Sequence, residues 1–242
     1  MSKSWSRKVS FHFWTKESGM TSMLILLCIS NFVITPFFTR QQSLHFLVRV
    51  IWFLLLVAGI TTLSRNRSRM RIFSIIPVLL FVLVVIRFFW DNQILDYFEL
   101  IIDLSAFSLL IGMVLVKVFE SGPVTIHRVV GAVVVYMLIG DVWAIMFQFI
   151  NVHLPGSFQV PDSFTNTGIS TSTFLYFSYT TLSTTGYGEI VPLHALPRTL
   201  VTIEQLIGVL YPVVLLGRLV SLVVVNPDTS TGEQTKKNPD SK

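Results

Sequence analysis

The chain has 242 residues, of which 52% are hydrophobic and only 13% are charged, and its mean hydropathy is +0.69. A soluble domain carries roughly 25% charged residues, so this composition excludes an ordinary soluble protein and predicts a membrane protein. The formal net charge of +5 does not indicate nucleic-acid binding, because the basic residues are scattered in short groups between apolar runs. The single cysteine, Cys28, excludes an internal disulfide framework and a cysteine-based metal cluster.

Six apolar runs are long enough to cross a bilayer. They cover residues 20–38, 44–63, 72–90, 94–118, 129–150 and 200–225. A further run near residues 173–182 is too short to cross. The segments between the runs, including the polar stretch 151–171, hold charges or helix breakers and are predicted to be turns exposed to water. The sequence therefore predicts an all-α membrane protein with six transmembrane helices.

Lysine and arginine predict the orientation, because short cytoplasmic loops retain positive charge. Fourteen of the eighteen basic residues fall on one side: before the first span, between the second and third, at the connection between the fourth and fifth, and from Arg218 to the end of the chain. Both termini are therefore predicted to be cytoplasmic. A cleaved signal peptide is the weaker interpretation, since no small-residue cleavage site follows the first run. Residues 1–19 form the predicted N-terminal segment, and residues 226–242 have the composition of a disordered tail.

The short apolar run lies on the predicted outer side and is expected to form a helix over about residues 172–182. It is followed by Thr184-Thr-Gly-Tyr-Gly188. Exposed backbone cannot cross hydrocarbon, so this re-entrant segment must be wrapped in protein or line a watery path. Two glycines at alternate positions permit positive φ, which lets successive carbonyls turn the same way. The helix also points its negative C-terminal end toward the middle of the membrane, which favours a cation there.

The segment Tyr176-Phe-Ser-Tyr-Thr-Thr-Leu-Ser-Thr-Thr-Gly-Tyr-Gly-Glu189 resembles the pore loop of potassium channels, whose TVGYG filter replaces the hydration shell of K+ with backbone carbonyls. Residues 202–212 and 216–220 are similar to the inner helix of the same family. In detail the chain resembles small prokaryotic channels with one two-helix pore unit per chain, and this resemblance covers residues 129–225, the expected pore domain.

That resemblance implies a potassium-selective homotetramer of the plasma membrane, embedded in lipid and with no cofactor besides the permeant K+. The implied filter residues are Thr184, Thr185, Gly186, Tyr187 and Gly188, of which the first four would bind K+. Ser183 and Glu204 would support the filter, with Glu204 bracing the pore helix by hydrogen bonds. Glu189 would form a ring of carboxylates at the outer mouth.

Two residues depart from the family pattern, and they bear on the alternatives. Thr185 stands where an aliphatic residue is usual, which leaves a nonselective monovalent cation channel open as an alternative. Glu189 stands where aspartate is usual and keeps the carboxylate. A transporter subunit is a second alternative, but a transporter that builds its filter from repeats would show the glycine segment more than once. An enzyme is not expected, because the five histidines have no metal-ligand spacing.

The sixth span contains three residues that can loosen a helix, namely Gly208, Pro212 and Gly217. Proline removes a backbone hydrogen bond and glycine lowers the cost of bending. These positions are therefore candidates for a gating hinge. The alternative is that the glycines serve close packing between helices, and the sequence does not choose between the two.

Residues 20–118 form a predicted four-helix membrane domain without gating charges. A voltage sensor needs basic residues at every third position of its fourth helix, but the fourth span has no basic residue before Lys117. It carries Asp96, Glu99 and Asp103 on one face instead. Arg49 and Arg87 lie at similar depth and are predicted to pair with these acids; a proton-sensing role is the alternative.

Asp141 lies near the middle of the fifth span, where an unpaired charge is costly. One hypothesis is that Asp141 contacts the first four spans and couples them to the pore. The other is that it is a buried, hydrogen-bonded acid without such a role.

Overall fold

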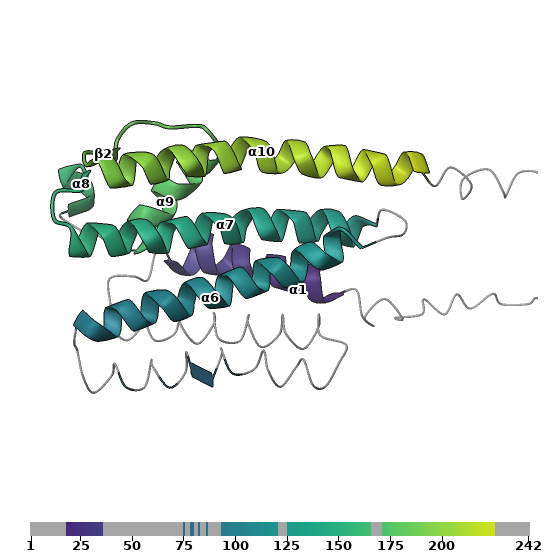
Figure 1. Cartoon of the computed structure of the whole chain (residues 1–242), viewed down its shortest axis with the longest axis horizontal. Coiled ribbons are helices and arrows are strands. Elements are labelled where there is room, and N and C mark those ends of the chain that lie inside the picture. The colour runs from purple at the N-terminus through teal and green to yellow at the C-terminus, as the bar shows by residue number, and fades with distance from the viewer. Residues whose placement is uncertain are drawn as a thin grey trace, which may run out of the picture.

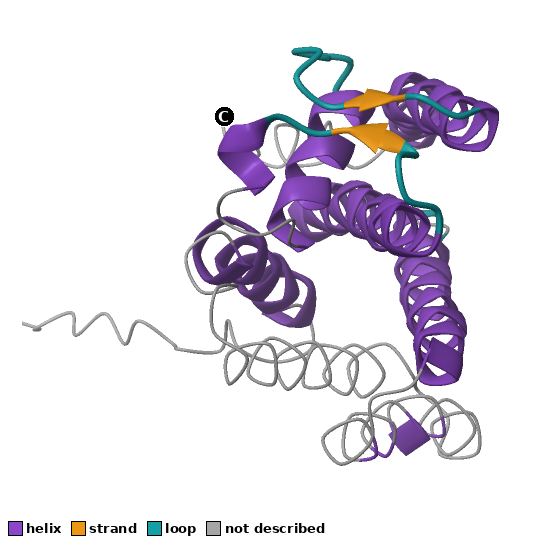
Figure 2. Ribbon diagram, turned by 90° about the vertical axis from the view of Figure 1, so that its left-hand side faces the viewer, coloured by secondary structure: helices purple, strands orange, loops and turns teal. Residues whose placement is uncertain are grey.

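The structure, a computed structural model, describes residues 18–35, 93–120, 125–165 and 171–225. It also describes five single helical positions, namely Ile75, Val78, Leu79, Val82 and Ile86. Long helices run alongside one another, and the short elements gather at one end of them (Figure 1). Figure 2 shows the two short strands next to each other at that end.

Helices make up most of the described chain. Helix α1 spans Ser18–Cys28 and continues as the π-helix η2 over Ile29–Ile34. The long helices are α6 (Gln93–Val118), α7 (Ile126–His153) and α10 (Ala195–Val225). The shorter elements are β1 (Phe158–Gln159), α8 (Asp162–Thr165), α9 (Thr171–Leu182) and β2 (Val191–Pro192).

Three of the described helices are long and apolar enough to cross a membrane, over Ile94–Val118, Ile126–His153 and Ala195–Arg218. They coincide with the fourth, fifth and sixth predicted spans. The first predicted span is described only up to residue 35, where Met20–Ile34 forms a shorter apolar helix. The second and third, over 44–63 and 72–90, lie outside the described residues except for the five single positions. The count of six spans therefore stays a prediction.

Helix α7 is the centre of the described fold. It packs against α1 and α6 and against α9 and α10. Its sequence is apolar around the whole circumference, which is typical of a helix buried on several sides, and 56% of its most apolar stretch is buried. The corresponding value for α10 is 17%. Helix α10 therefore keeps most of its apolar surface uncovered within one chain.

Two clusters of buried side chains hold these helices together. Mainly aliphatic residues of α1, α6 and α7 form the first, around Leu27, Leu110 and Leu138. Aromatic residues form the second, where Phe147 of α7 lies between Phe158 and Phe177 with ring centroids 5.7 and 5.3 Å away. Such edge-on aromatic pairs add about 0.5–1.5 kcal/mol each beyond the burial of their area. The second cluster fixes α9 against α7.

The prediction that residues 151–171 form a turn exposed to water is wrong for part of this stretch. Strand β1 pairs antiparallel with β2, with Phe158 opposite Pro192 and Gln159 opposite Val191. Phe158 is buried because it packs into the aromatic cluster, and this depends on residues distant in sequence. The pairing has a consequence for the chain between the strands. Residues 158 and 192 lie side by side, so α9 and the loop after it begin and end at the same end of the bundle.

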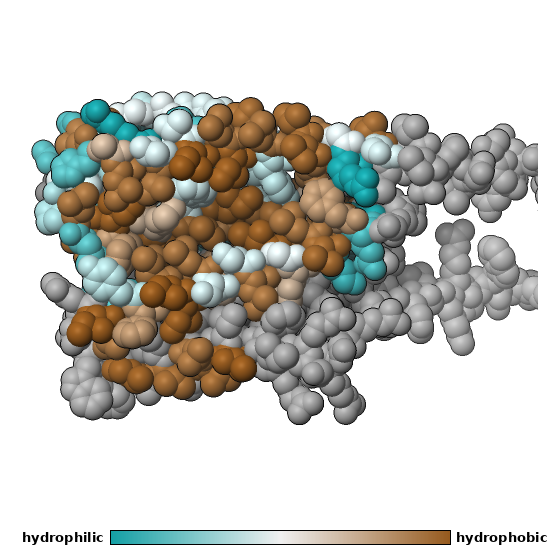
Figure 3. Space-filling model, viewed as in Figure 1, coloured by the Kyte–Doolittle hydropathy of each residue, from teal (hydrophilic) through white to brown (hydrophobic). Residues whose placement is uncertain are grey.

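The surface of the described part agrees with a membrane environment. On the face shown in Figure 3, hydrophobic residues cover the length of the helices and hydrophilic residues gather at the two ends. An apolar band with polar ends is what a bilayer requires of a protein that spans it.

Candidate functional site

Helix α9 ends about halfway along its two long neighbours. It lies between α7 and α10 (Figure 1). The hydroxyl of Tyr136, near the middle of α7, donates to the carbonyl of Leu182 over 3.0 Å. The same carbonyl lies against Gly208, near the middle of α10. With 12 residues, α9 is about 18 Å long, which is close to half the thickness of a hydrocarbon core.

The loop that follows α9, residues 183–189, has an unusual backbone. Positive φ occurs at three alternate positions: Thr184 at 58°, Gly186 at 51° and Gly188 at 79°. Positive φ at the two glycines agrees with the sequence-based expectation, whereas Thr184 was not expected to adopt it. The Gly186 N–H donates to the Thr180 carbonyl over 3.0 Å and holds the loop to the end of α9.

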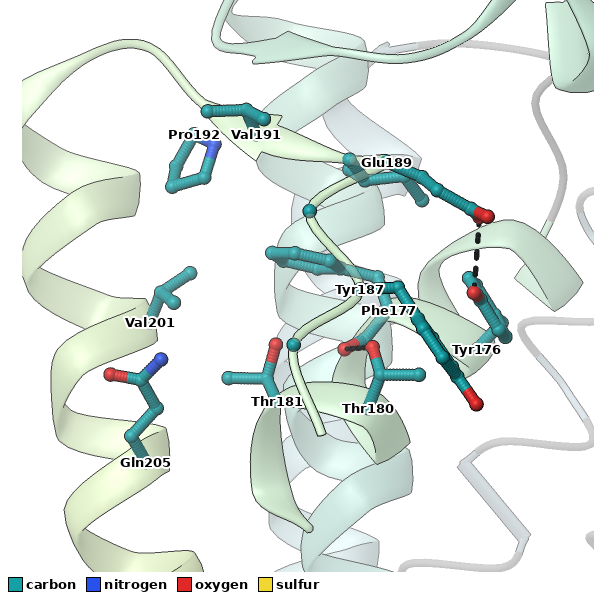
Figure 4. Close-up of a pocket in the computed structure, with 13 residues that line it drawn as sticks. Tyr176, Phe177, Thr180, Thr181, Tyr187, Glu189, Val191, Pro192, Val201 and Gln205 are labelled. Carbon is teal, nitrogen blue, oxygen red and sulfur yellow. Dashed lines mark hydrogen bonds between the residues drawn. The ribbon is translucent and has the colours of Figure 1, made fainter. Parts of the chain in front are cut away.

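Side-chain hydrogen bonds are made near both ends of this loop. The hydroxyls of Ser183 and Thr185 lie 2.9 Å apart and share a hydrogen bond. At the other end, the Tyr176 hydroxyl donates to Glu189 Oε2 over 3.0 Å (Figure 4). Burial, together with this bond to Glu189, raises the pKa of Tyr176, so the phenol stays protonated and remains a donor. The Tyr176 and Tyr187 rings stack nearly parallel, 6.4 Å apart.

The whole 183–189 loop is exposed in the single chain, and the Tyr187 side chain is 69% exposed. Figure 4 shows a pocket beside it, with Thr180 and Thr181 of α9 on one side and Val201 and Gln205 of α10 on the other. In the single chain the backbone of this loop is therefore accessible to a neighbouring molecule.

Glu204 is fully buried on α10 and contacts the middle of α9. Ser178 Oγ lies 2.5 Å from Glu204 Oε1 and 2.7 Å from the Gly140 carbonyl oxygen of α7. This is the kind of contact that the bracing role expected for Glu204 requires. A hydroxyl has one proton and a carbonyl can only accept. Both bonds are therefore made together when Glu204 is a neutral acid that donates to Ser178, while Ser178 donates to Gly140.

We expect Glu204→Gln to keep the stability of the protein, because the glutamine amide can donate to Ser178 as the neutral acid does. Glu204→Ala is expected to lose about 2–4 kcal/mol, from the broken bond and the space left behind. In detergent this would lower the thermal midpoint by several degrees. A Glu204→Gln protein as unstable as Glu204→Ala would contradict donation from Glu204 to Ser178.

The three hinge candidates have different surroundings. A Cβ added at Gly208 would clash with the carbonyl of Leu182, so this glycine is required for close packing. A Cβ at Gly217 would meet nothing within 4 Å among the described residues. Pro212 lies inside α10 and leaves the Gly208 carbonyl without its helical donor. Beside it, the Tyr211 hydroxyl donates to the Ala132 carbonyl of α7 over 2.8 Å.

Asp141 is 3% exposed and contacts the first helix, as the coupling hypothesis requires: Asn31 Nδ2 donates to its Oδ1 over 2.7 Å.

The structure also describes the three acids of α6. Glu99 is buried, and Asp96 Oδ2 lies 3.8 Å from His153 Nε2 of α7, a neighbour that the sequence did not indicate. Asp103 is partly buried on the same helix. The predicted partners Arg49 and Arg87 lie outside the described residues.

Sequence reasoning missed several polar residues that hold the site. They are Asn31, Tyr136, Tyr176, Ser178, Tyr179 and Tyr211. Asn31 could have been found, because an amide inside an apolar run is costly unless it has a partner. The tyrosines and Ser178 have ordinary sequence surroundings, and only their contacts single them out. Among the described residues, no group of three or more His, Cys, Asp or Glu side chains could hold a metal ion.

Comparison with known proteins adds one finding. Residues 124–225 match a protein family described as ion channel. The match covers less than half of the chain, and it contains α7, α9, the 183–189 loop and α10. A comparison with curated proteins finds no match. Residues 124–225 are thus similar to ion channels, which supports a membrane-embedded channel and not an enzyme.

Proposed function

We propose that this chain is one subunit of a potassium-selective channel, in which four copies of the 183–189 loop surround one axis and conduct K+ passively. Thr184, Thr185, Gly186 and Tyr187 would supply the oxygens that replace the hydration shell of the ion. Glu189 would form the outer mouth. No cofactor is required besides the permeant ion.

The observation that carries the proposal is the alternation of φ at Thr184, Gly186 and Gly188. When positive φ recurs at every second residue, the intervening carbonyls turn to the same side. The loop would then present a column of backbone oxygens. Hard monovalent cations are bound by such oxygens.

The position of the loop supports assembly. The loop begins beside the middle of α7 and α10, both long and apolar enough to span a membrane. Irregular backbone at that depth cannot face lipid, yet the loop is exposed in one chain. Other protein must cover it. A chain with one such loop completes a four-fold cage as a homotetramer, with the uncovered apolar surface of α10 facing the pore and the neighbouring subunits.

In this arrangement α9 is a re-entrant pore helix that enters from the outer side, and both termini are cytoplasmic. The plasma membrane is the compartment proposed. Strong voltage dependence is not expected, because the predicted fourth span has acids where a sensor has basic residues.

The test is flux through purified protein in liposomes, measured for K+ and for Na+ under matched gradients. Faster flux of K+ than of Na+ supports the proposal. Equal flux of the two ions supports the second candidate, a nonselective cation channel of the same architecture. The oligomeric state in detergent, measured by light scattering, checks the tetramer.

The second candidate, the nonselective cation channel, is considered because Thr185 stands where related filters usually have an aliphatic residue. Thr185→Val removes its hydrogen bond to Ser183 and retains the branched shape. Such a bond contributes about 1 kcal/mol net in each subunit. Only the part of that energy that differs between bound K+ and bound Na+ changes the flux ratio, and 1.4 kcal/mol of difference corresponds to about tenfold. We therefore expect the ratio of K+ to Na+ flux to change by less than about tenfold. A larger rise in that ratio would mean that Thr185 itself relaxes the selectivity of the wild-type protein.

A further inference from the structure

A buried polar junction joins the first helix to the back of α9. The Asn31 side chain, 3% exposed, donates both amide protons: to Asp141 Oδ1 over 2.7 Å and to the Tyr179 hydroxyl over 2.8 Å. The Tyr179 hydroxyl also lies 3.2 Å from the Met137 carbonyl of α7. Asn31 belongs to η2, outside the segment that matches ion channels. One amide therefore connects three helices.

The first helix is distorted at this place. Residues Ile29–Ile34 form a π-helix, a rare conformation that is frequent at functional sites. The widened turn is closed by Thr35, whose N–H and hydroxyl both donate to the Ser30 carbonyl, the hydroxyl over 2.8 Å. The distortion is local, and it includes the residue that makes the junction.

The burial pattern of η2 is the reverse of that of a surface helix in a soluble protein: polar residues are buried and apolar residues are exposed. Ser30, Asn31 and Thr35 are buried against the rest of the chain, whereas Phe32 and Val33 are exposed. Exposed apolar residues suit lipid, but a buried amide needs partners. The segment is thus built to present polar groups to α7 and α9.

Tyr179 connects the junction to the 183–189 loop. Its carbonyl accepts the Ser183 N–H over 3.0 Å, at the point where α9 ends and the loop begins. Its ring lies against Gly140, where an added Cβ would come within 2.6 Å of Tyr179 Cε1. The ring also stacks with Phe32 of η2, with centroids 5.9 Å apart. A shift of η2 would therefore displace the last turn of α9.

We propose that Asn31 is a positioning residue for the ion pathway: through Tyr179 and Asp141 it sets the place of the end of α9, so that the N-terminal helix controls conduction at the 183–189 loop. The inference rests on the proposed channel function. It also names Asn31 as the residue of the first helix through which Asp141 would couple that helix to the pore.

The experiment uses the full chain in planar bilayers, after confirming that each variant assembles like the wild type. Asn31→Leu removes the amide and keeps a similar volume, and Tyr179→Phe removes only the hydroxyl. Each is expected to lower the open probability by at least roughly tenfold, because each of the four proposed subunits loses a buried hydrogen bond worth about 1 kcal/mol. Both variants break the Asn31–Tyr179 bond, so the effect of the double variant should be smaller than the product of the two single effects. Val33→Ala, in the same π-helix but exposed, is the control and should behave as wild type.

The outcomes separate this inference from the proposed function. If the wild type conducts and assembled Asn31→Leu opens as often as it does, the inference alone is overturned. Effects of Asn31→Leu and Tyr179→Phe that multiply in the double variant also overturn it, since they would then be independent. If Asn31→Leu does not assemble, the open probability of Tyr179→Phe is compared with that of Val33→Ala, and equal values overturn the inference. A wild-type protein that passes no cation overturns the proposed function and this inference with it.

Discussion

Replacing Gly186 by alanine is expected to abolish potassium flux while leaving the protein assembled. Gly186 has φ of 51°, and a residue with a Cβ loses about 1–2 kcal/mol in this conformation. An added Cβ meets nothing within 4 Å in the single chain, so the effect is on the backbone and not on packing. In the proposed tetramer the strain of the four subunits adds up, and we expect flux to fall by at least about a hundredfold.

Gly156 provides the matched control for this prediction. It also has positive φ, at 76°, and an added Cβ would meet nothing within 4 Å, but it lies between α7 and β1, outside the loop. Gly156→Ala should carry the same local strain and conduct like the wild type in the liposome assay. Wild-type flux in Gly186→Ala would contradict the filter proposal, and equal loss in both variants would indicate a general folding defect.

Replacing Gly208 by alanine is expected to destabilise the protein strongly. The added methyl group would meet the backbone of Leu182, with its carbonyl carbon at 2.8 Å and its Cα at 3.0 Å. Backbone atoms at the end of a packed helix cannot move aside as a flexible side chain can, so α10 would be forced away from α9. Overpacking of this kind costs about 1–3 kcal/mol or more, which exceeds the gain of about 1 kcal/mol in helix propensity.

Gly217 is the matched glycine on the same helix, with nothing within 4 Å of a Cβ among the described residues. Gly217→Ala should keep or raise the thermal midpoint, since alanine favours the helix. Thermal unfolding and the fraction of tetramer in detergent measure both variants. A Gly208→Ala protein as stable as the wild type would contradict the packing role. If assembled Gly217→Ala opens less often, Gly217 is a hinge.

Together these variants separate the two interpretations that the sequence left open for the glycines of α10, namely a gating hinge and close packing between helices. The contact with Leu182 assigns Gly208 to packing. Pro212 and Gly217 keep their candidacy as hinge residues, because they lie beyond the part of α10 that Glu204 and Gly208 hold against α9. The fixed part lies beside the 183–189 loop, and bending below it would leave that loop undisturbed.

The amino-acid sequence by itself determined the elements whose cause is local. Apolar runs predicted α6, α7, α9 and α10 to within a few residues, since burial in lipid or protein needs a continuous apolar stretch. Glycine at alternate positions predicted the positive φ at Gly186 and Gly188, since only glycine adopts it without strain.

Only the tertiary structure decided the features that depend on residues far apart in the chain. It paired Phe158 with Pro192, placed Leu182 against Gly208, and brought Asn31 to Asp141 and Tyr179 across more than a hundred residues. The reason is physical: a hydrogen bond or a close backbone contact needs both partners at a distance of a few ångströms, and the pattern of one partner does not reveal the other. The sequence therefore specified the helices and the loop of residues 126–225, and packing around α7 specified how they are held together.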